Sequence, residues 1–258
     1  MKNVLLTVEY DGTNFAGWQR QPSVRTVQGV LEEGLSTVCG YPVTVEGASR
    51  TDAGVHALGA SAGFRGDFGI PVERIPLAVN HIFRGRTPSP GVNGDLRIVQ
   101  AREVPADFHP RFDAKGKKYR YIIRNRKEMP VFLRNYRYHV EKPLDVEQMK
   151  SAAAQVVGTH DFACFQATGS YPRRTTVRTV YFLSVEEGRE GDIVIEVGGD
   201  GFLYNMVRII AGTLTDVGLG KIPPEAMADI IAGRDRSRAG HTAPPQGLYL
   251  VEVYYQEA

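Results

Sequence analysis

Apolar residues recur at helical or strand spacing along most of the chain. In residues 26–38 they fall at i, i+3, i+4, i+8 and i+11 and so share one face of a helix, with Thr26 placed to cap it. Further helices are predicted over residues 71–83, 144–157 and 202–217. Alternation of apolar and polar residues predicts strands over residues 4–10, 41–45, 96–104, 118–124, 176–185, 193–197 and 248–254.

These elements fall into two groups, each with a small sheet and covering helices. Because their order does not read as a run of βαβ crossovers, we expect an α+β fold with mainly antiparallel sheets. The two groups join near residues 105–110. The sequence therefore predicts an N-terminal domain over residues 1–106 and a C-terminal domain over residues 107–258.

The 258 residues are 42% hydrophobic and 23% charged, as in ordinary globular proteins. The N-terminal segment turns polar early, unlike the apolar centre of a signal peptide, and no apolar run approaches the roughly 18 residues of a membrane helix. We therefore expect a cytoplasmic protein without membrane association. Cys39 and Cys164 lie far apart, and the sequence has no Cys-x-x-Cys motif or histidine pair at ligand spacing. This pattern argues against a disulfide framework and against a cysteine-based zinc site.

Charge is distributed unevenly, although the net charge is only +2. Between Phe108 and His139 the sequence has ten basic residues but only two acidic ones, and tyrosines are interleaved with the basic residues. Cations among aromatic residues fit a polyanion whose bases can stack, which indicates nucleic acid, whereas a solvated charged face is the alternative. The basic residues are Arg111, Lys115, Lys117, Lys118, Arg120, Arg124, Arg126, Lys127, Arg134 and Arg137.

Asp52 lies in a loop of small residues, 47–56, that directly follows a predicted strand. Loops held by a rigid sheet often carry the chemistry of a protein, and a positioned, ionised aspartate can act as a covalent nucleophile. Alternatively, Asp52 caps the next element or closes a turn. No order of Ser, His and Asp typical of a hydrolytic triad stands out elsewhere.

Two further elements carry unusual polar residues. In the strand over residues 117–123, Tyr119 and Tyr121 share one face, where they are either core residues or a ring that stacks on a base. Arg208 lies inside an otherwise apolar helix, beside its expected core face. It either snorkels to solvent or is a partly buried cation that needs a carboxylate partner, for which Asp52 is a candidate.

Residues 47–57, Gly-Ala-Ser-Arg-Thr-Asp-Ala-Gly-Val-His-Ala, closely resemble the active-site loop of the tRNA pseudouridine synthase A (TruA) family. The resemblance extends over nearly the whole chain, through Tyr10–Gln19, Val27–Gly29, Phe108–Phe112, Lys118–Tyr121, Gly201–Arg208 and Gly247–Leu250. It implies a pseudouridine synthase fold of two ferredoxin-like or RRM-like halves with the active-site cleft between them. It also implies a homodimer that isomerises uridine to pseudouridine at positions 38, 39 and 40 of the tRNA anticodon stem-loop, without cofactor or metal.

The resemblance also implies roles for single residues. Asp52 matches the nucleophile, Arg208 the arginine that pairs with it, Arg50 the arginine that assists nucleotide eversion, and Tyr119 the ring that stacks on the target uracil. A uridine in a duplex must leave the stack before a carboxylate can reach it. The residues that match RNA contacts of the family are Phe108, His109, Arg111, Lys127, Gly169 and Arg173.

The sequence departs from the family pattern at two places. The segment 81–99 is longer than is usual, and we expect a surface insertion there rather than an RNA-contacting flap. Pro110 replaces the usual alanine and stiffens the bend that carries Arg111. Two other function classes remain open from the residues alone: a non-catalytic RNA-binding module, and a carboxylate-nucleophile hydrolase, which would leave the basic run unexplained.

Overall fold

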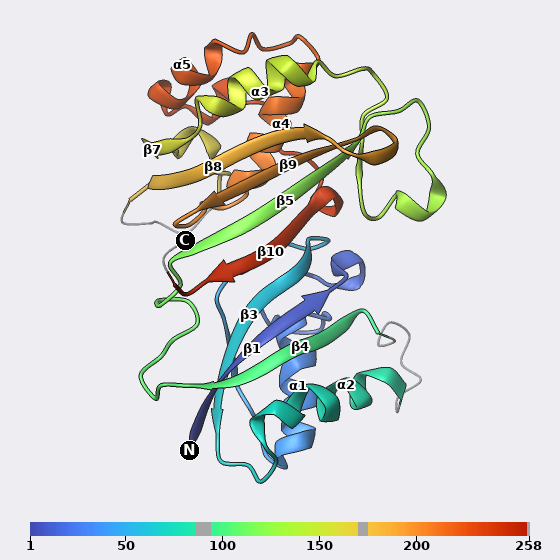
Figure 1. Cartoon of the computed structure of the whole chain (residues 1–258), viewed down its shortest axis with the longest axis vertical. Helices are drawn as coiled ribbons and strands as arrows, with labels where there is room; N and C mark the ends of the chain where they lie inside the picture. Colours follow the sequence, from blue (N-terminus) through green and yellow to red (C-terminus); the bar gives the residue numbers. More distant parts are fainter. Residues whose placement is uncertain (86–93, 170–174, 257–258) are drawn as a thin grey trace. The chain divides into compact units, whose positions relative to one another are not determined.

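The computed structural model describes residues 1–85, 94–169 and 175–256 (Figure 1). The chain divides into two compact units, unit 1 with Met1–Lys115 and Leu250–Ala258, and unit 2 with Gly116–Tyr249. The fold is α+β with mainly antiparallel strand pairs, as predicted. The division falls later than the predicted boundary at residue 106, and most of the last strand lies in unit 1 instead of the C-terminal domain.

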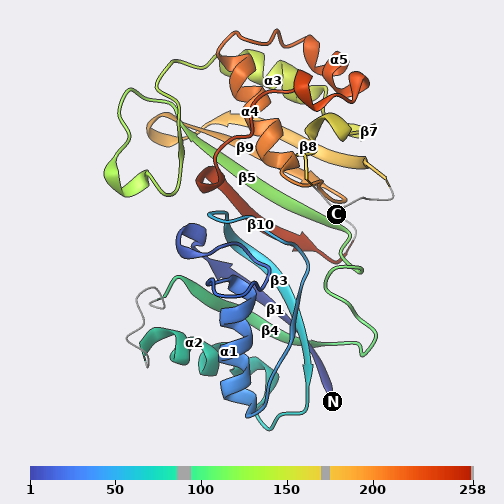
Figure 2. The same cartoon turned by 180° about the vertical axis from the view of Figure 1, so that it is seen from behind.

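The sheet of unit 1 is built around β1 (Lys2–Tyr10), which pairs antiparallel with β3 (His56–Gly66) and β4 (Leu96–Val104). The short β2 (Val45–Gly47) also pairs with β3, and β10 (Leu248–Tyr254) is the next strand beyond β3. Most of β1 is buried, namely residues 3–6, 8 and 10, and α1 (Val27–Cys39) and α2 (Ile75–Gly85) cover one face of these strands (Figure 2). The core of unit 1 lies between this face and the helices.

The first helix follows the sequence pattern closely, whereas the strand after it does not. Thr26 caps α1 as predicted, because its hydroxyl accepts a hydrogen bond from the Gly29 amide at 3.3 Å. The strand expected over residues 41–45 begins only at Val45. The amide of Val43 donates to the Ser36 hydroxyl at 2.8 Å instead of to a neighbouring strand. A side chain of the helix thus replaces a sheet partner.

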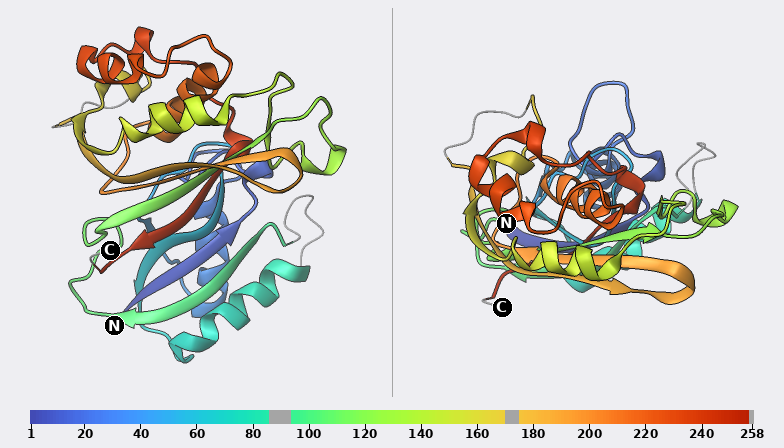
Figure 3. Two further views of the ribbon diagram at one scale, coloured as in Figure 1. Left: turned by 45° about the horizontal axis from the view of Figure 1, so that its top comes forward. Right: turned by 90° about the horizontal axis from the view of Figure 1, so that it is seen from above.

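The sheet of unit 2 has the order β5 (Gly116–Arg124), β9 (Asp192–Gly199), β8 (Val177–Glu187) and β7 (Gly158–Asp161), all antiparallel. The short β6 (Tyr138–His139) pairs parallel with β5. Helices α3 (Val146–Ala154) and α4 (Met206–Gly218) pack on these strands and on each other, and α5 (Ala226–Gly233) lies farther out (Figure 3).

Helix α4 is the most deeply buried helix of unit 2, with every residue from Met206 to Gly218 buried except Arg208. It begins at Met206 rather than at residue 202, because Asn205 has a left-handed backbone with φ of 59°. This conformation cannot continue a right-handed helix. None of the helices in the described residues is both long and apolar enough to cross a bilayer.

Candidate active site

Asp52 occupies the first position of a tight turn in the loop between β2 and β3. The Val55 amide donates to the Asp52 carbonyl at 3.2 Å, and Gly54 has φ of 77°, which defines a type II turn. Asp52 therefore takes part in a turn, as the alternative to a catalytic role predicted, but the residue is only half-buried. The turn presents this carboxylate from a fixed backbone, so the turn and a chemical role are compatible.

The loop rests on a floor of aromatic residues contributed by β1 and the segment after it. The Trp18 amide donates to the Thr51 carbonyl at 3.0 Å, and the Tyr10 and Thr51 hydroxyls share a buried hydrogen bond of 2.7 Å. Trp18 is 2% exposed, and a Cβ atom on Gly47 would lie 2.4 Å from its indole ring. Both backbone and side chain of Thr51 are thus fixed beside Asp52.

This floor is the part of the candidate site that sequence reasoning missed. Residues 10–19 carried the resemblance to the family, but no role followed from it. The buried ring of His56 adds a further tie, since its Nδ1 accepts a hydrogen bond from the Gly12 amide at 3.0 Å. The unusual density of aromatic and glycine residues in residues 10–18 was the one local signal that could have indicated such a support.

Arg208 lies in the first turn of α4 and is half-buried. Its Nε donates to the Ala243 carbonyl at 2.8 Å, and Nη1 donates to Oδ1 of Asn205 at 3.0 Å. An arginine that snorkels would leave its guanidinium in solvent. These hydrogen bonds instead fix the direction of the guanidinium, so the Arg208 cation has a defined position within unit 2.

The two tyrosines of β5 differ in their surroundings. Tyr121 is fully buried, its hydroxyl donates to the Pro244 carbonyl at 2.7 Å, and burial raises its pKa well above the ordinary value. Tyr119 is half-buried and meets the ring of Phe202 edge-on, with centroids 5.2 Å apart. Tyr121 is therefore a core residue, and Tyr119 is the one of the pair whose ring is partly exposed.

Part of the basic run is neutralised inside the protein. Lys118 and Arg120 both contact Glu196, at 2.8 and 2.7 Å. Burial alone would raise the pKa of the Glu196 carboxyl, but the hydrogen bonds from these two cations lower it. Arg124 and Arg137 in turn contact Asp192, at 3.5 and 2.8 Å. Both acids lie on β9, so the count of charges along residues 108–139 overstated the positive charge available to a polyanion.

The bend that carries Arg111 is held by hydrogen bonds around His109. The His109 amide donates to Oδ2 of Asp113 at 2.7 Å, and its Nδ1 accepts from the Arg111 amide at 3.1 Å. Pro110 is buried and lies close to Gly63, where a Cβ atom would be 3.1 Å from the proline ring. Proline is therefore accommodated at this position, and the Arg111 side chain is exposed.

The remaining predicted RNA contacts have different surroundings. The Phe108 ring is half-buried against Tyr255, with centroids 5.1 Å apart, whereas Lys127 is exposed. Gly169 lies in a turn with φ of 80°, and no atom is within 4 Å of a Cβ built on it. Arg173 lies outside the described residues, as do residues 86–93 of the expected insertion.

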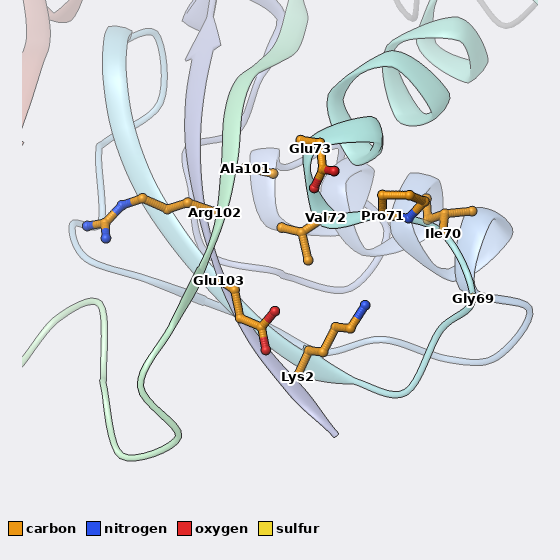
Figure 4. A pocket seen from close by; sticks show the side chains of 9 residues that line it. All are labelled: Lys2, Gly69, Ile70, Pro71, Val72, Glu73, Ala101, Arg102 and Glu103. Carbon is orange, nitrogen blue, oxygen red and sulfur yellow. The ribbon is translucent and has the colours of Figure 1, made fainter.

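Neither the cavity on unit 1 nor a search for metal-binding groups points to the predicted site residues. A cavity of about 620 Å³ lies on unit 1, where Figure 4 shows Lys2, Glu73 and Glu103 around it and Arg102 pointing away. Among the described residues, no group of three or more His, Cys, Asp or Glu side chains could hold a metal ion. The predicted residues themselves are divided, with Arg50 and Asp52 in unit 1 and Tyr119 and Arg208 in unit 2.

Comparison with known proteins connects these residues to a family. A sequence model described as tRNA pseudouridine synthase matches residues 6–113 and 152–256. The tRNA pseudouridine synthase A of Thermoanaerobacter sp. (strain X514) is 49% identical over 255 residues, and that of Acetivibrio thermocellus is 49% identical over 256. Each alignment covers 99% of this chain and 100% of the relative.

A more distant relative and one solved structure complete the comparison. The tRNA pseudouridine synthase A of Geotalea uraniireducens is 44% identical over 255 residues, with the same coverage of both chains. A chain in the crystal structure of a Cbf5-Nop10-Gar1 complex aligns with 96% of this chain and 47% of its own length, at 10% identity and a TM-score of 0.34. This remote similarity adds nothing about function.

Proposed function

This chain belongs to the tRNA pseudouridine synthase family, and on that premise we propose that it isomerises uridine to pseudouridine in tRNA with Asp52 as the nucleophile. The observation that carries the proposal is the full-length similarity, which includes the loop over residues 47–57. The structure supports it with the type II turn at Asp52 and the hydrogen bonds that fix Thr51. The target positions are 38, 39 and 40 of the anticodon stem-loop.

The reaction requires one bond to break and one to form on the same nucleotide. Asp52 assists cleavage of the bond between N1 of uracil and C1′ of the ribose. The uracil then turns, C5 bonds to C1′, and a proton leaves C5 while N1 gains one. Atoms and electrons balance within the substrate, so the chemistry needs no oxidant or second substrate.

Three further residues have supporting roles in this proposal. Arg208 pairs with Asp52 and keeps the carboxylate charged, which agrees with its half-buried, hydrogen-bonded guanidinium. Tyr119 stacks on the target uracil with the exposed part of its ring. Arg50 is exposed and assists eversion of the nucleotide, which costs a few kcal/mol of lost stacking.

The proposal also assigns the wider contacts of the substrate. We expect the exposed cations Arg111 and Lys127 to contact phosphates, together with Phe108, His109, Gly169 and Arg173 along the tRNA. The enzyme acts as a homodimer in the cytoplasm, the compartment that holds its tRNA substrate. The non-catalytic RNA-binding module is the competing function, and it predicts binding without any change in the RNA.

The test is to incubate the purified protein with an unmodified tRNA transcript that carries uridines in the anticodon arm, and to map pseudouridine. Wild type should form product, and Asp52→Asn, which keeps the size but removes the nucleophile, should lose several orders of magnitude in rate. Asp67→Asn, an exposed aspartate on the same unit, is the matched control and should retain the rate. Binding without product in wild type would identify the RNA-binding module instead.

A further inference from the structure

Residues 240–244, which we call the strap, run directly along α4. A Cβ atom on Gly212 of α4 would lie 1.9 Å from the His241 carbonyl oxygen, so glycine alone permits the strap to pass this close. The Gly240 amide donates to the Thr213 hydroxyl at 3.0 Å. The backbone of the strap thus lies directly against the helix at Gly212.

The strap carries an acceptor that fixes the guanidinium of Arg208. Arg208 and Ala243 exchange two hydrogen bonds: the Ala243 amide donates to the Arg208 carbonyl at 3.0 Å, and Arg208 Nε donates to the Ala243 carbonyl at 2.8 Å. The next carbonyl, of Pro244, accepts from the buried Tyr121 hydroxyl. The direction of the Arg208 side chain therefore depends on where the strap lies.

His241 ties the strap to the other end of α4. Its Nδ1 lies 2.9 Å from Oδ2 of Asp216, and its amide donates to the same oxygen at 3.3 Å. Lys221 holds the other oxygen of Asp216 at 2.9 Å, from an exposed position away from the strap. Burial would raise the pKa of the Asp216 carboxyl, but the hydrogen bonds from His241 and Lys221 lower it.

Both ring nitrogens of His241 have a polar partner. Nδ1 lies 2.9 Å from Oδ2 of Asp216, and Nε2 lies 3.1 Å from the Tyr138 hydroxyl. The ring is then held at both nitrogens, by α4 and by β6. Arg236 adds a separate tie on the strap, donating to the Gly240 carbonyl at 2.9 Å and to the Thr242 hydroxyl at 3.1 Å.

We propose that His241 and Asp216 are positioning residues for Arg208, because they fix the strap whose Ala243 carbonyl holds the guanidinium. The inference rests on the proposed function of Arg208 as the partner of the nucleophile. Neither residue needs to touch the substrate. A displacement of about 1 Å in a catalytic constellation can cost about a hundredfold in rate. Because the contacts of Arg236, of the Gly240 amide with Thr213 and of the His241 amide with Asp216 remain without the imidazole, the expected loss is smaller, about tenfold.

The test compares kcat and KM for tRNA among variants of the same cluster, each corrected for its folded fraction. His241→Ala should lower kcat about tenfold and leave KM within about twofold, because the RNA-binding surface is unchanged. His241→Asn keeps a donor to Asp216 near the position of Nδ1 and should restore kcat to within about threefold. Lys221→Ala is the matched control, since it removes the other partner of the same carboxylate without touching the strap, and its kcat should equal that of wild type.

A second measurement establishes whether His241 acts through Arg208. In an Arg208→Ala background, His241→Ala should cause no further loss of kcat, since the group it positions is gone. Modification of Arg208 by phenylglyoxal, followed by mass spectrometry, should rise several-fold in His241→Ala and not in Lys221→Ala. Asp216→Asn serves in both measurements if His241→Ala does not fold.

The outcomes separate this inference from the proposed function. The inference is overturned by an unchanged kcat in His241→Ala, by a full tenfold loss in the Arg208→Ala background, or by unchanged modification of Arg208. Because the modification does not depend on turnover, it reports on the strap even if wild type forms no pseudouridine. Inactive wild type would refute the proposed function alone.

Discussion

Gly47→Ala is expected to disturb the loop that carries Asp52, although it adds a single methyl group. Gly47 is the last residue of β2, and a Cβ built on it would lie 2.4 Å from the indole ring of Trp18, where ordinary contact begins at 3.4 Å. The ring must therefore move by about 1 Å. Trp18 is buried and its amide donates to the Thr51 carbonyl, so the movement reaches the residue next to Asp52.

The change in the free energy of unfolding has two parts, the strain of the added methyl group in the folded state and the reduced flexibility of the unfolded chain. Forcing a methyl group into a filled site costs about 1–3 kcal/mol, and the loss of glycine flexibility in the unfolded chain offsets about 0.4–1 kcal/mol of it. The net loss is then about 0–2.6 kcal/mol, which lowers the melting temperature by up to about 10 °C in a protein of this size. The shift of the loop should also lower kcat by about tenfold to a hundredfold.

Thermal unfolding and single-turnover pseudouridine formation measure the two effects. Gly69→Ala is the matched control, because no atom lies within 4 Å of its Cβ position and its φ is not in the left-handed region. That variant should be as stable as wild type or slightly more so, with unchanged turnover. If Gly47→Ala behaved like Gly69→Ala in both assays, the reasoning that Trp18 couples Gly47 to Asp52 would be refuted.

Three other predictions concern the remaining contacts. Thr51→Val removes the buried hydrogen bond to Tyr10 and should lower the free energy of unfolding by about 1–3 kcal/mol in denaturant titrations, with a lower kcat; unchanged stability would contradict a fixed floor. Asp216 has a lowered pKa, so its ionised form stabilises the fold above the ordinary pKa near 4, and this stability is lost as pH falls through the lower folded value. Asp216→Asn should therefore be less stable than wild type at pH 7, and the difference should shrink below about pH 4 in melting curves; a constant difference would contradict this. Lys127→Ala should reduce the slope of log tRNA affinity against log salt by about 0.9, because Lys127 is exposed. Arg120→Ala should change this slope less, because Arg120 is paired with Glu196. Equal changes in the two variants would contradict the assignment of Lys127, and not Arg120, to phosphate contact.

Elements with strong local periodicity were predictable from the sequence. The strands over residues 96–104 and 248–254 have the predicted bounds, and α1 begins one residue after its predicted cap. Predictions were wrong where a local contact overrode the pattern. At residues 41–44 the Ser36 hydroxyl takes the place of a strand partner, and at Asn205 a left-handed backbone delays the start of α4.

The charge pattern was only partly predictable. Lys118 and Arg120 belong to a run that is almost free of acids in sequence, yet Glu196 lies beside both of them on the neighbouring strand. Strand pairing brings together residues far apart in the chain, and a count along the sequence does not include them. The exposed positions of Arg111 and Lys127 likewise became visible only in the folded chain.

The sequence alone determined the α+β class and identified the loop around Asp52, because hydrophobic period and the run of small residues are local properties of the chain. The resemblance of that loop to one family likewise depends only on the order of its residues. Tertiary structure decided how the loop is supported and how Arg208 is held. Trp18 beneath Thr51, and the strap with His241 against α4, are contacts between segments that only folding brings together. Their geometry depends on how closely backbone can approach a ring or a helix, which no local pattern specifies.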